Sequence, residues 1–309
     1  MRANELGLRP VGFLGALRRG WQRYGTGTLF VAPFLVLFAV FYILPVFTSI
    51  VLSFTNFNMI QEWSFVGLAN YRLLFTDDRV FLTALANTFI FAGIVGPVGY
   101  LASFAMAWVI NQLKLRNVFS LAFYAPSICN GVAISYVWLY IFSGDRYGVI
   151  NNMLFKLGFI SQPILWDRDP TYLMPVIIII SVWMSMGTGF LVFLAGLQSL
   201  PDELYEAAAI DGVKSRWVEL WYITLPQLKP QLLYGAVSAI VNSFVVFEIG
   251  LTVAGLPSPN YAAHTIVAHL FDYAFIRFQM GYASAISVFL FLLTFGLGRL
   301  AMRVFRSDT

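Results

Sequence analysis

The sequence has 309 residues, of which 59% are hydrophobic, 17% aromatic and only 11% charged. An average soluble domain is about 25% charged, so these proportions exclude an ordinary water-soluble surface. The formal net charge of +4 comes from basic residues beside apolar segments, which favours a role in membrane orientation over nucleic-acid binding.

The first 28 residues precede the first long apolar run. That run begins too late and is too long for the hydrophobic region of a cleavable signal peptide, so we expect residues 1–28 to form a cytoplasmic tail. Leu6, Val11, Leu14 and Leu17 would line one face of a basic amphipathic helix lying on the membrane. A disordered tail is the alternative.

Six later segments are long and apolar enough to cross the bilayer, which takes roughly 20 residues in a helix. Helix is expected in all six because a spanning segment must satisfy its backbone hydrogen bonds internally. The segments are Leu29–Phe54, Ala84–Ile110, Val118–Phe142, Tyr172–Leu197, Leu232–Ala254 and Tyr282–Met302. Pro33, Pro45, Pro97 and Pro126 lie inside them and favour kinks, which suit a moving transporter but are also tolerated generally in membrane helices.

The distribution of Lys and Arg predicts the orientation. With the N-terminus inside, most of the 19 basic residues fall on the cytoplasmic side, as insertion favours. The sequence therefore predicts an all-α integral membrane protein with six spans and both termini in the cytoplasm, the last six residues, 304–309, forming a short tail.

A long, patterned loop lies between the fourth and fifth segments, at residues 199–230. It reads SLPDELYEAAAIDGVKSRWVELWYITLPQLKP. Ser199 is expected to cap a helix whose first turn carries Asp202 and Glu203, because acidic residues are favourable at a helix N-terminus. Gly212 suits the left-handed end of that helix, and Ser215 is placed to cap a second one. The loop is thus predicted to be a helix, a sharp turn and a helix held against the cytoplasmic face.

This loop resembles the EAA loop of permease subunits in binding-protein-dependent ABC importers. The resemblance is carried by Glu206-Ala207-Ala208, by Ala209-Ile210-Asp211-Gly212 and by Ile223-Thr224-Leu225-Pro226. It implies a coupling helix that sits in a groove of an ATP-hydrolysing subunit. The residues that the resemblance assigns to this coupling are Glu206, Ala207, Ala208, Asp211, Gly212, Leu225 and Pro226. In one respect the loop departs from the family pattern, because the ten residues Val213 to Tyr222 are one more than that pattern has, which leaves the register of the second helix open.

Other segments are similar to the maltose-type and glycerol-phosphate-type sugar permeases of that family. They are Phe65–Tyr71, Phe123–Pro126, Tyr147–Asn151 and Met280–Ala285. The resemblance implies the type I ABC importer transmembrane fold over residues 29–303, in the bacterial cytoplasmic (inner) membrane. It also implies a second homologous permease, two ATP-binding subunits and an extracytoplasmic solute-binding protein as partners. No Gly-x-x-x-x-Gly-Lys-Ser/Thr motif occurs, so ATP and Mg are expected on the partner subunits and not on this chain.

Polar residues inside the spans mark a candidate path for a hydroxylated solute, because they are costly in lipid. In the fifth segment Ser238 and Asn242 lie one helical turn apart with Ser243 adjacent, and Ser185 and Thr188 do likewise in the fourth. The alternative is hydrogen bonding between helices, which is common for these residue types.

Three other polar positions have less specific roles. Glu248 is expected to gate, to pair across a subunit interface, or to lie near the outer end of its span where water reaches. His264 and His269 lack a nearby cysteine or a close cluster of carboxylates in the sequence, and Cys129 is the only cysteine. No metal site is therefore expected, and the histidines are expected at the surface or in loop packing.

No catalytic motif occurs in the spans, so the chain is not expected to be an enzyme. The main competing interpretation is an ion-coupled secondary transporter, which would need more intramembrane carboxylates than Glu248 alone. The sequence does not exclude a channel.

Overall fold

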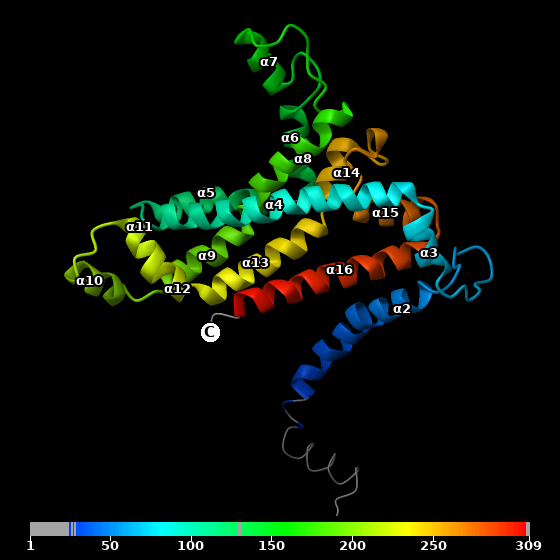
Figure 1. Ribbon diagram of the computed structural model, residues 1–309, viewed down its shortest axis with the longest axis horizontal. Helices are drawn as coiled ribbons and strands as arrows, with labels where there is room; N and C mark the ends of the chain where they lie inside the picture. Colours follow the sequence, from blue (N-terminus) through cyan, green and yellow to red (C-terminus); the bar gives the residue numbers. More distant parts are fainter. Residues whose placement is uncertain (1–24, 26, 28, 129–130, 307–309) are drawn as a thin grey trace, which may run out of the picture. The chain divides into compact units, whose positions relative to one another are not determined.

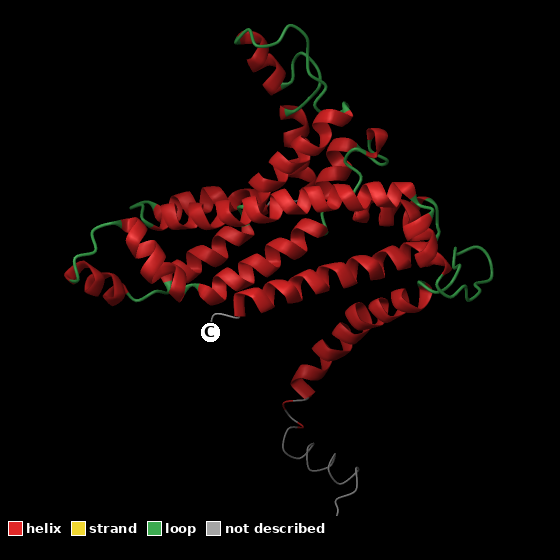
Figure 2. Ribbon diagram, viewed as in Figure 1, coloured by secondary structure: helices red, strands yellow, loops and turns green. Residues whose placement is uncertain are grey.

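The computed structural model describes residues 25, 27, 29–128 and 131–306. This described part consists of helices and loops, as Figure 2 shows. It has one isolated antiparallel bridge, between Thr55 and Phe65. It divides into two units, one ending at Val51 and one beginning at Leu52. Apart from Gly25 and Gly27, the predicted N-terminal tail lies outside the described residues.

The first unit contains a single apolar helical run, Leu29–Leu52, which extends into the start of the second unit. It includes the π-helical turn η1 (Ala39–Ile43) and the helix α2 (Leu44–Leu52).

The second unit contains the remaining helices, labelled in Figure 1. They are α3 (Ala69–Thr76), α4 (Arg79–Asn111), α5 (Arg116–Ile128), α6 (Gly131–Ile141), α7 (Val149–Lys156), α8 (Pro170–Ser185), α9 (Thr188–Gln198), α10 (Asp202–Ile210), α11 (Arg216–Glu219), η2 (Leu220–Thr224), α12 (Leu225–Gln227), α13 (Lys229–Phe244), α14 (Glu248–Ala254), η3 (Pro259–Tyr261), α15 (Ile266–Phe271), η4 (Asp272–Ile276) and α16 (Met280–Arg306).

Five helical stretches of the described part are long and apolar enough to cross a membrane, and each overlaps one predicted segment. They are Leu29–Leu52, Arg79–Asn111, Pro170–Gln198, Lys229–Ala254 and Met280–Val304. The third predicted segment instead falls on two shorter helices, α5 and α6, and the two residues between them are not described. Five of the six predicted spans thus have a matching helix, and the third stays a prediction.

Two of the matching stretches are broken helices. Met186 and Gly187 separate α8 from α9, and a non-helical segment at residues 245–247 separates α13 from α14. At the second break Phe247 has φ −143° and ψ −57°, outside the helical region. Breaks of this kind are tolerated at membrane depth where neighbouring protein groups or a cavity meet the freed backbone groups.

The helix α4 is the centre of the second unit and packs against α8, α9 and α13, while α13 also packs against α16. Small residues make these close approaches possible. A Cβ atom added to Gly96 would lie 3.4 Å from Ser243 Oγ of α13, and one added to Gly235 of α13 would lie 2.5 Å from the ring of Phe193 of α9. Packing through small residues is the expected means of helix association where lipid provides no hydrophobic drive.

Candidate functional site

The loop at residues 199–230 forms a helix, a turn and a helical return, as predicted. The first helix, α10, ends at Gly212, whose φ of +88° is the left-handed conformation expected there. The amide N–H of Val213 donates to the Ala208 carbonyl over 2.9 Å, which closes the turn.

The predicted cap of this helix is wrong. Ser199 belongs to the end of α9, where its hydroxyl donates to the Gly196 carbonyl over 2.7 Å, and Pro201 occupies the cap position of α10. Ser215 does occupy the cap position of α11, but without a side-chain hydrogen bond to the helix.

The residues assigned to coupling occupy different depths in the fold. Glu206, Ala207, Asp211, Gly212 and Pro226 are exposed, Leu225 is half-buried, and Ala208 is 8% exposed. The helix α10 therefore has one buried residue, Ala208, and exposes Glu206 and Ala207.

The extra residue of the loop coincides with a π-helical turn. Residues Leu220–Thr224 form η2, directly before Leu225 and Pro226. A π turn holds one residue more per turn than an α-helix does, so it absorbs a single inserted residue without shifting the helix that comes after it. The loop thereby reaches Leu225 in helical geometry despite its additional length.

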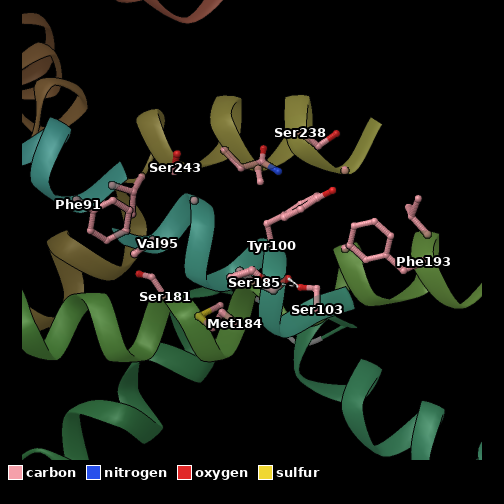
Figure 3. A pocket seen from close by; sticks show the side chains of 18 of the residues that line it. Phe91, Val95, Tyr100, Ser103, Ser181, Met184, Ser185, Phe193, Ser238 and Ser243 are labelled. Atoms are coloured by element: carbon pink, nitrogen blue, oxygen red, sulfur yellow. Dashed lines mark hydrogen bonds between the residues drawn. The ribbon is translucent and has the colours of Figure 1, made fainter. Parts of the chain in front are cut away.

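A cavity of about 480 Å³, open on one side, lies among α4, α8, α9, α13 and α14. Figure 3 shows its wall, which combines aromatic rings, glycines and polar side chains. The polar lining residues are Tyr100, Ser103, Ser181, Ser185, Tyr234, Ser238, Asn242 and Ser243.

Four of the five residues predicted for a solute path line this cavity, and they differ in what their side chains offer. The hydroxyls of Ser185 and Ser243 donate to carbonyls of their own helices, at 2.7 Å to Val182 and 2.8 Å to Ile240. They retain only acceptor capacity toward the cavity. Asn242 and Ser238 also line the wall, whereas Thr188 begins α9 and its side chain is not described.

The sequence analysis missed other polar groups of the wall. Ser181 Oγ is buried with no hydrogen-bond partner among the described residues, and it lies on α8 one turn before Ser185. Ser103 donates to the Gly99 carbonyl over 2.7 Å and also lies 3.2 Å from the Ser185 carbonyl. The spacing of Ser181 and Ser185 at i and i+4 is the signal that could have found Ser181.

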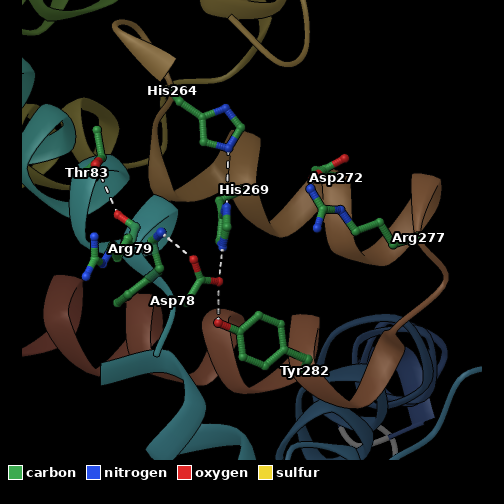
Figure 4. Close-up of polar contacts among 9 residues, drawn as sticks. Asp78, Arg79, Thr83, His264, His269, Asp272, Arg277 and Tyr282 are labelled. Carbon is green, nitrogen blue, oxygen red and sulfur yellow. Dashed lines mark hydrogen bonds and ion pairs between the residues drawn. The ribbon is translucent and has the colours of Figure 1, made fainter. Parts of the chain in front are cut away.

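A second polar cluster lies at the start of α4, drawn in Figure 4. Asp78 Oδ1 accepts the backbone N–H of Phe81 over 2.8 Å and caps α4. Its other oxygen, Oδ2, accepts the hydroxyl of Tyr282 over 2.7 Å and lies 2.9 Å from His269 Nε2. The second ring nitrogen of His269, Nδ1, lies 3.3 Å from Nε2 of His264.

This cluster corrects the expectation for the histidines. His264 and His269 are each 1% exposed, so a surface position is wrong. His264 packs in the loop before α15, and His269 lies within α15. Folding also brings them the carboxylate that the sequence did not place near them, since Asp78 is 191 residues from His269. The described residues contain no group of three or more His, Cys, Asp or Glu suited to a metal ion.

Burial and hydrogen bonding set the charges in the cluster. Burial alone would raise the pKa of Asp78, but the hydrogen bonds from His269, Tyr282 and the Phe81 backbone outweigh it and hold that pKa well below its usual range. Burial, reinforced by His269, lowers the pKa of His264 to about 4. At neutral pH the cluster therefore contains an ionised Asp78 and an uncharged His264.

Glu248 is exposed at the first turn of α14, directly after the break at residues 245–247. A negative charge is favourable at this helix end.

Comparison with known proteins places the chain in a family. The model of the family described as "Binding-protein-dependent transport system inner membrane component" matches residues 96–306. The probable ABC transporter permease protein YesP of Bacillus subtilis (strain 168) is 36% identical over 265 residues, which are 84% of this chain and 84% of YesP. The arabinooligosaccharides transport system permease protein AraP of the same organism is 32% identical over 284 residues, 90% of this chain and 89% of AraP.

A solved structure shows the same fold. One chain of a bacterial ABC transporter involved in the import of the acidic polysaccharide alginate matches with a TM-score of 0.82 and 23% identity, over 95% of this chain and 99% of that chain. The fold is therefore that of a type I ABC importer permease, and the secondary-transporter interpretation is set aside. ATP hydrolysis in such importers is performed by separate subunits, so this chain is not an enzyme. The chain belongs to the family of inner-membrane components of binding-protein-dependent transport systems, as a multi-pass permease subunit.

Proposed function

We propose that this permease imports a sugar, an oligosaccharide or a similar polar solute, delivered by an extracytoplasmic binding protein. AraP, which is 32% identical over 90% of this chain, is named for arabinooligosaccharide transport. The cavity wall supports the same solute class, because it combines aromatic rings with hydroxyl and amide groups. Sites of this composition bind solutes that have both apolar faces and hydroxyl groups.

The proposed topology has six spans, with α5 and α6 together forming the third and both termini in the cytoplasm. The excess of Lys and Arg on that side supports the orientation. In this topology residues 1–28 and 304–309 are cytoplasmic tails of a transmembrane domain at 29–303, and the loop 199–230 faces the cytoplasm.

The coupling role is proposed for the exposed face of α10 and for the helical segment that follows it, which includes Leu225 and Pro226. The observation that carries it is the exposure of α10, which buries Ala208 and leaves Glu206 and Ala207 open to a partner. Small side chains permit close approach, and Glu206 offers a charge. The proposed coupling set is Glu206, Ala207, Ala208, Asp211, Gly212, Leu225 and Pro226.

The solute path is proposed to run through the cavity. Asn242 and Ser238 are its strongest members, because the hydroxyls of Ser185 and Ser243 already donate to their own helices. An amide side chain both donates and accepts hydrogen bonds, as recognition of a sugar hydroxyl requires. Thr188 is retained as a member from the sequence pattern alone.

The proposed assembly contains this chain, a second homologous permease and two ATP-binding subunits that use Mg and ATP. ATP binding draws the coupling loops together and favours one of two packings of the permease pair, which is all that coupling requires.

The experiment that tests this proposal is co-purification from the native host in mild detergent. ATP-binding subunits and a second permease are expected with the wild-type chain, and the recovered assembly is expected to hydrolyse ATP. The double variant Glu206→Lys/Gly212→Asp is expected to lose these subunits or their ATPase activity, because it reverses the exposed charge and adds a side chain at a positive φ.

A matched control reverses a charge elsewhere, at Glu62, which is exposed in the loop before α3. Glu62→Lys is expected to leave the assembly and its ATPase activity unchanged. The proposal fails if the wild-type chain purifies alone and binds or transports solute with no ATPase present.

A further inference from the structure

One side-chain hydrogen bond ties α10 to the π-helical turn η2. Tyr205 Oη of α10 lies 3.0 Å from Thr224 Oγ1, the last residue of η2. Thr224 is 2% exposed and Tyr205 is half-buried, so water reaches this contact only from the Tyr205 side.

The direction of the bond is set by the number of hydrogens available. The Thr224 hydroxyl donates its single hydrogen to the Glu219 carbonyl over 3.2 Å. Tyr205 must therefore be the donor in the bond to Thr224 Oγ1. The Thr224 hydroxyl thus joins the Glu219 carbonyl at the start of the turn to Tyr205 of α10 through the same oxygen.

The same turn is connected by direct contacts to the cavity. The amide of Leu228 donates to the Thr224 carbonyl over 3.1 Å, and the fully buried Leu228 side chain belongs to the hydrophobic cluster that includes Phe193. Phe193 lines the cavity and packs edge-on against Tyr100, with 5.4 Å between ring centroids. Each step from α10 to the cavity wall is thus a direct contact between neighbouring residues, and Thr224, Leu228 and Phe193 along it are buried.

We infer that Tyr205 and Thr224 are positioning residues that transmit displacement of α10 to α12, α13 and the cavity. This inference rests on the proposed function, in which a partner subunit moves α10. An exposed helix held only by flexible connections would yield to that force locally. A hydrogen bond to the buried Thr224, which is followed by α12 and then α13, makes α10 move together with the cavity wall.

The test measures ATP-dependent change at the cavity and needs no knowledge of the solute. In the full assembly, with Cys129 replaced by Ser, Asn242→Cys reports cavity accessibility through its labelling rate with a water-soluble maleimide, with and without ATP and Mg. Tyr205→Phe removes one hydroxyl and keeps the ring. It is expected to reduce the ATP-induced change in labelling rate about fivefold, the value of one net hydrogen bond, while ATP-binding subunits still co-purify.

Three further variants separate transmission from folding. Thr224→Val is expected to act like Tyr205→Phe, and Thr224→Ser, which keeps the hydroxyl, is expected to behave as the parent. Tyr222→Phe is the matched control, because Tyr222 is 79% exposed in the same turn and its hydroxyl is expected to be dispensable. If Thr224→Val lowers the yield of folded protein, Tyr205→Phe remains decisive, since it leaves the bond from Thr224 to Glu219 intact.

Each outcome has a defined meaning. An undiminished ATP response in Tyr205→Phe overturns the inference alone. Loss of the ATP-binding subunits from that variant also overturns it, because the pair would then serve attachment. If the parent with Tyr205 and Thr224 intact retains no ATP-binding subunit or shows no ATP response, the proposed function itself fails, and the inference fails with it.

Discussion

Replacing Asp78 by Ala is expected to destabilise the second unit strongly, because one carboxylate satisfies three buried donors. The change removes the cap of α4, which is worth about 1 kcal/mol. It also leaves the Tyr282 hydroxyl and His269 Nε2 buried without this acceptor, at a cost of about 1–3 kcal/mol each. Relief of the buried charge offsets part of this, so the expected loss in the free energy of unfolding is about 3 kcal/mol.

The neighbouring Asp77 provides the matched control, because it is exposed and its carboxylate accepts only a local hydrogen bond from Thr76. Thermal unfolding in one detergent at a fixed scan rate, followed by tryptophan fluorescence, compares the variants. Asp78→Asn is expected to be nearly as damaging as Asp78→Ala, because its amide group turns donors toward the donors of His269 and Tyr282. Equal midpoints for Asp78→Ala and Asp77→Ala would refute the assigned role of the carboxylate.

Three further predictions concern other positions. First, the unfolding midpoint of the wild type should fall as the pH drops from about 6.5 to about 4. The low pKa of His264 means that in this window only the unfolded state binds a proton at this residue, and His264→Gln should weaken the pH dependence. Second, Gly212→Ala should speed hydrogen exchange at residues 207–215 about fivefold, measured by mass spectrometry. The added Cβ meets nothing within 4 Å, so the cause would be backbone strain at φ +88° and not a clash. Third, Gly99→Ala should lower the unfolding midpoint, corresponding to about 1–3 kcal/mol, because its Cβ would overlap Ser185 Oγ.

Each of these has a control. The titration of His264 is contradicted if His264→Gln retains the full pH dependence. For Gly212, Asn tolerates the left-handed conformation better than Ala, so Gly212→Asn should exchange more slowly than Gly212→Ala, and the reverse order would exclude backbone strain as the cause. For Gly99, the second change Ser185→Gly should restore stability, and no restoration would mean that the overlap is not the source of the loss.

Asp78 and the two histidines show what sequence patterns leave undetermined. His264 and His269 were expected at the surface or in loop packing, and the sequence offered no close cluster of carboxylates beside them. Their partner, Asp78, precedes α4, and its contact with His269 depends on the register of α4 against α15 and α16. The residue pattern within a single segment cannot predict the register of one helix against another.

The loop at 199–230 contains features that the sequence predicts correctly and features that it does not. Its two helical parts and the turn at Gly212 obey local rules, because a glycine at a helix end and acidic residues in a first turn act over a few residues. The cap was misassigned to Ser199, because α9 extends to Gln198 and the Ser199 hydroxyl is used at its end. The extra residue is accommodated in η2, where the Thr224 hydroxyl donates to the Glu219 carbonyl, and the sequence shows neither the turn nor this bond.

The sequence by itself determined the membrane class, the five matching spans, the helical loop and the resemblance to an importer permease. These properties depend on the composition of contiguous stretches or on short motifs, so one segment at a time is enough to find them. Only the tertiary structure decided which serines line the cavity while their hydroxyls donate to carbonyls of their own helices. It also decided which carboxylate contacts the histidines and where the spans at α8–α9 and α13–α14 break. The physical reason is that these features depend on the distance and rotation between packed helices, and small residues such as Gly99 and Gly235 set those by contacts with residues far away in the chain.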